Sequence, residues 1–192
     1  MESLATDSSL WPLITSISLG IGLAACCGFR VFVPLLVTNI SYLAGYATPS
    51  VGFEWMGTWG AFALLATATV IEIIAYYVPL LDNLLDHLAT PAAFIAGTLL
   101  MTSLLPESQP IAKWALGLIL GGGSAGVIQV GTHLLRLGST ATTGGIGNPI
   151  VATAENGLSI FLSILALLLP ILVAIGMIFF IFWLIKRLVA KK

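Results

Sequence analysis

The stretch at 158–185 reads LSIFLSILALLLPILVAIGMIFFIFWLI and contains no charged side chain. About 20 apolar residues suffice to cross the hydrocarbon core of a bilayer, which is roughly 30 Å thick, as an α-helix. The stretch therefore predicts a transmembrane helix, the clearest one in the chain. Basic residues at the end of a span favour the cytoplasmic side. Four of them follow this stretch, namely Lys186, Arg187, Lys191 and Lys192.

Composition places the rest of the chain in the same solvent. Of its 192 residues, 58% are hydrophobic and only 8% are charged, whereas about 25% of the residues of a soluble domain are charged. The mean hydropathy is +1.08, so no water-soluble surface can be built from this chain. The sequence predicts a single transmembrane domain over 1–192, with the lipid bilayer as its partner. A net charge of -1 excludes nucleic acid, which needs a basic face.

Four more segments are apolar and long enough to cross a membrane, so the sequence predicts an all-α protein of about five transmembrane helices. The four are 13–37, 59–79, 84–105 and 111–135. The third is the least regular, because polar residues crowd its start and Pro91 lies inside it. A re-entrant segment there is the alternative, and it would reduce the number of spans to four.

Two connecting segments, 39–58 and 138–157, are rich in glycine, serine and threonine. Their backbone polar groups cannot face lipid unsatisfied, so we expect interfacial or re-entrant loops. Five spans with a cytoplasmic C-terminus place the acidic N-terminus outside. Lys113 then lies on the cytoplasmic side, as the usual distribution of basic residues requires, whereas Arg136 lies outside and is the one exception.

Small residues form two similar stripes that superpose when the sequence is shifted by 99 residues. This pattern predicts two repeat units at about 13–80 and 111–185, joined by a linker helix at about 84–105. One linker between two units of two helices inverts the second unit, which is the arrangement of many transporters. Small residues four apart also let helices pack closely, so helix packing or the seam of a homodimer is the other interpretation. The stripes contain Gly22, Cys26 and the nearby Gly28, and Gly117, Gly121 and Ala125.

Arg30 and Glu72 are ionisable residues inside predicted spans. An ionisable group at membrane depth costs about 2.5 to 3.5 kcal/mol and marks a candidate functional site. Arg30 either reaches the membrane interface with its long side chain or takes part in such a site. An ion pair between Glu72 and Arg30 is the economical structural explanation, and a relay of protons or cations through Glu72 is the functional one. The sequence leaves these alternatives open.

Other polar residues extend the candidate pathway from Glu72. Tyr76 follows one helical turn later and can donate a hydrogen bond to the Glu72 carboxylate. Asp82 and Asp86 continue an acidic stripe towards the outer interface of the membrane. We therefore expect these two aspartates at the outer mouth of the pathway.

The second repeat unit supplies further polar positions. The shift of 99 residues pairs Gln129 with Arg30 and places His133 opposite Pro34. Glu155 and Asn156 open the last predicted span, where acidic and amide side chains suit a helix N-terminus. The complete predicted pathway contains Arg30, Glu72, Tyr76, Asp82, Asp86, Gln129, His133, Asn148 and Glu155.

Motifs of soluble enzymes are absent from the sequence, including the GxSxG, P-loop, HExxH and dinucleotide-binding patterns. The adjacent Cys26 and Cys27 point in different directions on a helix, so they predict neither a disulfide nor a zinc site. We expect no enzyme activity, no metal and no cofactor. A lipid-modifying enzyme is a distant third alternative for the function.

Three stretches carry a resemblance to a known family. They are GLAACCGFRVFVP at 22–34, the run at 72–91 with its YYVP and DNLLD, and GNP at 147–149 ahead of Glu155 and Asn156. Together they resemble the bacterial integral membrane family catalogued as domain of unknown function 4126, and the resemblance covers nearly the whole chain. It implies a multi-pass protein of the bacterial inner membrane and assigns no catalytic or binding residue.

The polar residues and the repeat together favour a small transporter or channel for an ion or small solute, coupled to protons or cations through Glu72. Arg30 and Glu72 would form its central site. Five helices give a thin wall around a pathway, so we expect a homodimer joined through the small-residue faces. The alternative is a scaffold or assembly factor for a membrane complex, in which those faces bind partner helices.

Overall fold

The computed structural model describes residues 3–106 and 109–189, and this part of the chain is all-helical, with 84% of residues in helices and no strand. The predicted fold class is confirmed. Three helices are long and apolar enough to cross a membrane: the continuous helix Pro110–Thr143, Asn148–Leu168 and Pro170–Arg187. Shorter apolar helices accompany them, and the chain is a polytopic membrane protein.

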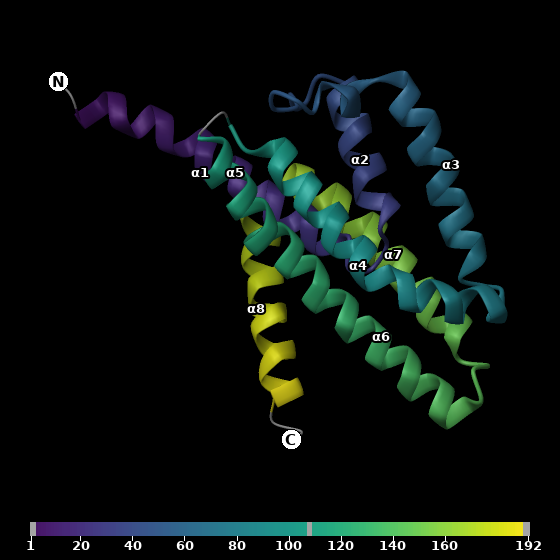
Figure 1. The fold of residues 1–192 in the computed structure, drawn as a ribbon. Coiled ribbons are helices and arrows are strands. Elements are labelled where there is room, and N and C mark those ends of the chain that lie inside the picture. Colours follow the sequence, from purple (N-terminus) through teal and green to yellow (C-terminus); the bar gives the residue numbers. More distant parts are fainter. Residues whose placement is uncertain (1–2, 107–108, 190–192) are drawn as a thin grey trace.

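The described residues form seven helical segments (Figure 1). The helix Pro110–Thr143 is built from three consecutive parts, and a short 3-10 turn, η1, lies between α2 and α3. The elements are α1 (Ser3–Cys26), α2 (Phe32–Leu43), η1 (Glu54–Gly57), α3 (Trp59–Ala75), α4 (Pro79–Leu104), α5 (Pro110–Leu116), the π-helical η2 (Gly117–Gly122), α6 (Gly123–Thr143), α7 (Asn148–Leu168) and α8 (Pro170–Val189).

The first predicted span, 13–37, is wrong, because α1 and α2 form a helical hairpin. α1 ends at Cys26, and α2 returns beside α3 (Figure 1). A cavity of about 690 Å³ is lined by residues from the middle of α1, by the loop after α2 and by the end of α4, so the chain after α2 returns to the middle of α1 at one end of the molecule. We call this end, which carries residues 44–58, the loop end.

Local sequence explains the tip of the hairpin at 27–31. Pro34 lies in the first turn of α2, where backbone N–H groups have no partner within the helix and a proline costs little. Gly28 passes close to α6, since a Cβ atom added to it would lie 2.5 Å from the carbonyl oxygen of Ala125. The proline therefore begins a second helix instead of bending one long helix.

The third predicted segment is one regular helix. α4 runs for 26 residues, and Pro91 lies inside it without ending it, so the expected interruption at this proline is wrong. α4 packs against α1, η2 and α6. At the crossing with η2, a Cβ atom on Gly97 would lie 2.6 Å from the carbonyl oxygen of Gly121. Glycine on both helices is what lets their backbones approach so closely.

The expected loop at 138–157 is wrong, because nearly all of it is helical. α6 continues to Thr143 and α7 begins at Asn148, which leaves only a four-residue turn. Gly144 and Gly145 take φ values of +65° and +90° in that turn, a backbone conformation that glycine adopts without strain. We call the end of the molecule that carries this turn and the α3–α4 turn the network end.

The stretch at 158–185 is not one span but parts of two helices. Pro170 cannot donate a hydrogen bond to the preceding turn, so α7 ends at Leu168 and α8 begins at Pro170 with a new direction (Figure 1). Hydropathy is high on both sides of the proline, and it carries no information about this break. α7 and α8 are each long enough to cross a membrane.

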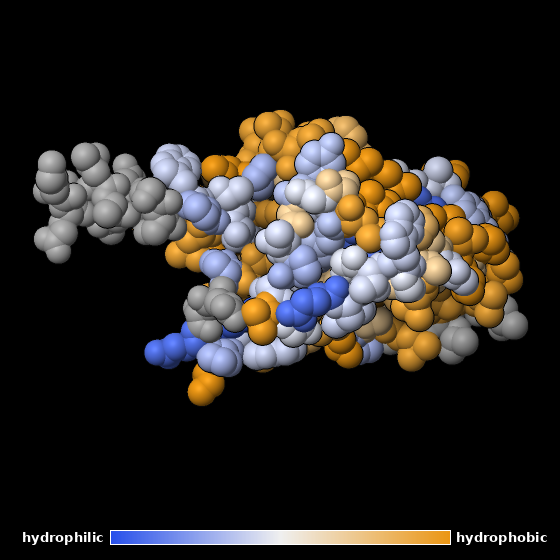
Figure 2. Space-filling view, turned by 90° about the horizontal axis from the view of Figure 1, so that it is seen from above, coloured by the Kyte–Doolittle hydropathy of each residue, from blue (hydrophilic) through white to orange (hydrophobic). Residues whose placement is uncertain are grey.

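The interior and the surface are arranged as in a protein that lies in lipid. The second half of α1 is buried between α4, α6, α7 and α8, and large apolar side chains cover the outside of α3 and α8. Figure 2 looks down on the loop end, where polar residues gather across the middle and hydrophobic residues cover much of the rim. The 99-residue repeat stays a prediction. The two units differ at one point, because the break at 27–31 corresponds to 126–130, which lie inside the continuous α6.

Candidate functional site

The tip of the α1–α2 hairpin carries Arg30 into the interior, where its side chain is only 1% exposed. The guanidinium lies 3.3 Å from Oε2 of Glu155 and donates to the carbonyl oxygen of Ala152 at 3.2 Å. Its Nε also donates to Oδ1 of Asn156. All three partners lie on α7, so the Arg30 side chain is held inside the bundle. The ion pair with Glu72, one of the two explanations that the sequence left open, is not formed.

Glu72, near the end of α3 and 6% exposed, caps α2 instead. Its Oε1 accepts from the backbone N–H of Val31 at 2.7 Å, and its Oε2 accepts from that of Phe32 at 3.0 Å. These N–H groups have no partner within α2, and the start of a helix favours a negative charge. The side chain of the N-cap residue, Val31, makes no capping hydrogen bond, and the capping carboxylate comes from a neighbouring helix.

A second buried arginine, Arg136 of α6, completes the site and was not among the predicted residues. It is 2% exposed, and its guanidinium binds both oxygens of Glu155, with Nε donating to Oε1 at 3.2 Å. It also pairs with Oδ1 of Asp82 at the start of α4. Glu155 therefore bridges Arg30 and Arg136. The sequence analysis counted Arg136 as a charge beyond the end of a span, which is wrong because Arg136 lies inside α6 and is buried.

Asp82 and Asn148 close the network on the side of the α6–α7 turn. Oδ2 of Asp82 accepts from Nδ2 of Asn148 at 3.1 Å, and the same amide donates to the hydroxyl of Thr140 at 3.1 Å. Asp82 is thus buried in an ion pair, not exposed at an outer mouth as expected. Glu155 lies inside α7, which begins at Asn148, so the expected capping role of Glu155 is also wrong.

Aromatic rings pack on the charged groups. α3 ends at Ala75, and the Tyr76 ring lies under both guanidiniums, with 3.8 Å from Cζ of Arg30 and 4.3 Å from Cζ of Arg136 to the ring centroid. Such contacts between a cation and an aromatic face are favourable when water is excluded. The neighbouring Tyr77 accepts from Nδ2 of Asn156 at 3.3 Å. The turn between α3 and α4 thereby holds the arginines in place.

We call these five charged residues the ion network: Arg30, Glu72, Asp82, Arg136 and Glu155. Four helices and the connection between α1 and α2 supply them, and all five side chains are buried. Two arginines face three carboxylates, so the network carries one negative charge in excess when every group is ionised. A buried charge is expensive unless it is paired. The start of α2 offsets part of this excess at Glu72, and one added proton or monovalent cation would neutralise the rest.

Two cavities meet at the ion network. The side groove, of about 320 Å³, lies between α3 and α4, and Glu72 is the one charged residue among its described lining residues. The end pocket, of about 380 Å³, lies beside the α6–α7 turn and is lined by Asp82, Tyr77 and Asn148. Tyr76 lines both cavities. A single aromatic side chain thus stands between a groove on the flank of the bundle and a pocket at its end.

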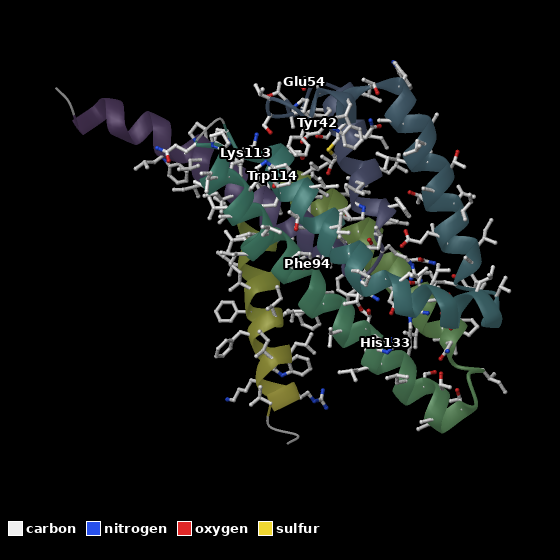
Figure 3. The ribbon with its side chains drawn as sticks, viewed as in Figure 1. Tyr42, Glu54, Phe94, Lys113, Trp114 and His133 are labelled. Atoms are coloured by element: carbon white, nitrogen blue, oxygen red, sulfur yellow. The ribbon has the colours of Figure 1, made fainter. Side chains whose placement is uncertain are left out.

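The remaining predicted residues have varied positions. Gln129 is buried on α6, and His133 is half-buried on the same helix, where Figure 3 labels it. The side chain of Asp86 lies outside the described residues. Among the residues that are described, no group of three or more His, Cys, Asp or Glu side chains could hold a metal ion.

Helical periodicity could have found Arg136. Gln129, Thr132 and Arg136 recur at the spacing of one helical face, and all three are buried. Ending the predicted helix at residue 135 excluded the arginine from that face.

Comparison of the chain with curated proteins and with solved structures finds no match. The model of one family, described as Domain of unknown function (DUF4126), matches residues 17–190. The match covers nearly the whole chain and includes the three stretches that carried the resemblance. The chain therefore belongs to the DUF4126 family.

Proposed function

We propose that the protein is a small transporter or channel for an ion or small polar solute, coupled to a proton or monovalent cation through Glu72. The observation that supports it is the charged tip of a broken helix, which lies inside a buried ion network between two cavities. Discontinuous helices in membranes are tolerated where they line a cavity, and in transporters they form the binding site.

Stability alone is a weak reason for a network of this kind. Bringing charges out of water costs several kcal/mol per ion, and apolar side chains of similar size often replace a buried ion pair without loss. The five charged residues come from four helices and from the connection between α1 and α2, so each has to be kept in register with the others. A role of the network in ion or proton transport explains this arrangement better than a role in helix packing.

In this proposal, Glu72 is the group that binds the proton or cation and couples its uptake to transport. Its carboxylate faces the apolar side groove and holds the N–H groups of Val31 and Phe32. A bound proton or cation neutralises the excess negative charge and weakens the carboxylate as an acceptor for these two N–H groups. The hairpin tip is then free to shift, and Arg30 shifts with it. Charge uptake at Glu72 is thereby linked to the geometry of the network.

The pathway runs from the end pocket to the side groove past Tyr76. The ring blocks the direct route, because it lines both cavities and packs under the two guanidiniums. A movement of Arg30 removes one of these two contacts. Tyr76 is therefore the gate of the proposed pathway, and the hairpin tip controls it.

The orientation of the chain remains part of the proposal, with a cytoplasmic C-terminus in the bacterial inner membrane. Arg136 and Lys113 are both buried, so neither counts as a loop charge for the distribution of basic residues. Exposed Lys186 and Arg187 at the end of α8 carry that argument. This removes the one exception found in the sequence, and the network end then lies towards the cytoplasm. We also expect a homodimer.

Proton flux into liposomes tests the proposal without knowledge of the solute. The full chain is reconstituted with a pH-sensitive dye inside the vesicles, and the internal pH is followed after an external acid pulse. We expect Glu72→Gln to remove most of the protein-dependent flux while the helical content stays unchanged. Glu54→Gln, which alters an exposed carboxylate of η1, is the matched control. Equal flux with and without Glu72 would contradict the coupling role.

Access of water to the side groove tests the same proposal independently. A cysteine at Ala75, which lines the groove, is placed in a background without Cys26 and Cys27 and treated with a membrane-impermeant thiol reagent. A cysteine at Leu64, which is exposed on the outside of α3, is the comparison. We expect faster labelling at residue 75. A groove that stays unlabelled, combined with absent flux, would refute a conducting pathway.

A scaffold that binds helices of partner proteins is the second candidate. The observation in its favour is the open space beside Gly157 of α7 and Gly176 of α8, where an added Cβ atom would meet nothing within 4 Å. Small residues on an outer face allow close approach of a further helix. In that case Glu72→Gln would prevent assembly of the protein and would leave no pH-dependent activity to lose.

A further inference from the structure

A fourth cavity, the second one at the loop end, lies far from the ion network along the bundle. It has a volume of about 410 Å³ and lies between the loop after α2, the upper part of α4 and the start of α5. Lys113, Trp114, Phe53 and Trp55 line it. Figure 3 shows Lys113 and Trp114 close to Glu54 at this end. We call it the lysine pocket, and the proposed pathway does not use it.

Lys113 is a buried cation whose partners among the described residues are neutral. It is 7% exposed, and its Nζ donates to the hydroxyl of Ser50 at 2.6 Å and lies 5.5 Å from the centroid of the Phe53 ring. Lys113 takes part in none of the ion pairs that the described residues form with one another. An ammonium group has three donors, and a buried charge needs an opposite one. The Ser50 hydroxyl supplies one acceptor and no charge.

Glu54 is the nearest acidic residue that the structure describes, and it is held elsewhere. Both its carboxylate oxygens accept from the backbone N–H of Gly52 at 3.0 Å. The carboxylate is exposed, and these backbone hydrogen bonds lower the pKa of Glu54 more than its attraction to Lys113 does. The two groups form no ion pair. The ammonium group therefore remains available to an anion that enters the pocket.

Aromatic residues place this pocket at the edge of the membrane. Four of the five tryptophans lie at the loop end, and tryptophan collects at the boundary between lipid and water. Trp55 and Trp114 form an exposed rim, with 50% and 45% of their surfaces accessible. A ligand thus enters past two indole rings and reaches a cation at the base.

Apolar side chains continue from the pocket towards the membrane core. Leu99 lines the pocket, and Ile95, one turn deeper on α4, is exposed. Trp114 lines it as well, and Leu118, four residues further along the same helix, is also exposed. An acyl chain that descends from the pocket would therefore contact apolar surface on both helices.

We propose that the lysine pocket binds the phosphate of a phospholipid headgroup, with Lys113 as its charged contact. The ammonium group supplies the opposite charge, the indole rings lie at headgroup level, and the exposed apolar residues accompany the acyl chains. A small soluble anion would match the charge alone. A phospholipid matches the charge, the rim and the apolar surface together.

Native mass spectrometry of the full chain in detergent tests this proposal. The delipidated protein is titrated with dioleoylphosphatidylglycerol, with dioleoylglycerol, which has the same acyl chains and no phosphate, and with inorganic phosphate. We expect one tightly bound phosphatidylglycerol, at least about tenfold weaker binding in Lys113→Gln, and retained binding in Lys113→Arg, which keeps the charge. Lys186→Gln, at the other end of the molecule, is the control.

Three results would overturn the proposal. Equal affinity for the two lipids would show that the phosphate is not recognised. Unchanged phosphatidylglycerol binding in Lys113→Gln would exclude this lysine as the contact. Tight binding of inorganic phosphate without any preference for the lipid would make the pocket a site for a soluble anion. Circular dichroism and Lys113→Arg together separate loss of binding from loss of folding.

Discussion

The two ends of the molecule bury cations in opposite ways. At the network end, Arg30 and Arg136 share the carboxylate of Glu155, and Arg136 also holds Asp82. At the loop end, Lys113 has the hydroxyl of Ser50 and the face of Phe53 but no carboxylate among the described residues. At the network end the arginines are paired with carboxylates of the same chain, and the remaining carboxylate, Glu72, is held by backbone N–H groups. The loop end leaves a charge available for a group from outside.

The role of a buried charge depends on where its partners come from. Four helices and the connection between α1 and α2 meet at the ion network, so we expect a change to one of its residues to disturb the others. Lys113 is held by one loop and one helix, so we expect its neighbours to change little when it is altered. Because a buried charge needs a partner, we expect the residues of the network end to depend on one another. At the loop end we expect Lys113 to bind a ligand.

Removal of Glu155 should have the largest effect on stability. Glu155→Gln leaves Arg30 and Arg136 without their shared carboxylate, and breaking a buried ion pair from one side costs about 3 to 5 kcal/mol. Thermal or denaturant unfolding in detergent measures the loss. Lys113→Gln is the matched change at the loop end and should cost far less. Equal losses for the two variants would show that the two ends do not differ in the way described.

Gly28→Ala should have the next largest effect. The new Cβ atom would lie 2.5 Å from the carbonyl oxygen of Ala125, so the hairpin tip has to move away from α6. Overpacking of this kind costs about 1 to 3 kcal/mol, and the displaced tip should also weaken the proton flux. Gly176→Ala, with nothing within 4 Å of its added Cβ atom, is the control for unfolding. A tip that tolerates alanine without loss would mean that it is loosely held.

The smallest expected effect is on the melting temperature at low pH, and it comes from the exposed Glu54. Backbone hydrogen bonds lower its pKa in the folded protein, so its carboxylate stabilises the loop end above the ordinary pKa of about 4.5. This contribution disappears as the pH falls through the lowered value. We expect the melting temperature of Glu54→Gln to fall slightly less than that of the natural chain between pH 7 and pH 3. A larger fall in the variant would reverse the sign and contradict the hydrogen-bonded loop.

Prediction from the sequence succeeded for the class of fold and failed for the course of the chain. The all-α membrane architecture and the family follow from composition and from three local stretches. The spans at 13–37 and 158–185 are wrong, because a hydropathy window averages over Pro34 and Pro170. At each of these prolines one apolar run is divided between two helices.

For the candidate site, the sequence likewise predicted one part correctly and another part wrongly. Arg30, Glu72, Tyr76, Asp82, Asn148 and Glu155 were selected because polar groups are costly in lipid, and the structure brings all six together. Their partners were assigned wrongly. Glu72 binds backbone N–H groups and not Arg30, and Arg136 was missed. Their role in a pathway remains a prediction.

From the sequence alone it follows that this protein lies in lipid, that it is helical, and that a few polar residues need partners inside it. The reason is that the cost of a polar group in lipid depends first on its residue type, which the sequence gives. Which groups are partners depends on the fold, because a hydrogen bond or ion pair requires residues far apart in the chain to lie within a few ångströms of each other. Two contacts of this kind are the capping of α2 by Glu72 and the pairing of Glu155 with both arginines.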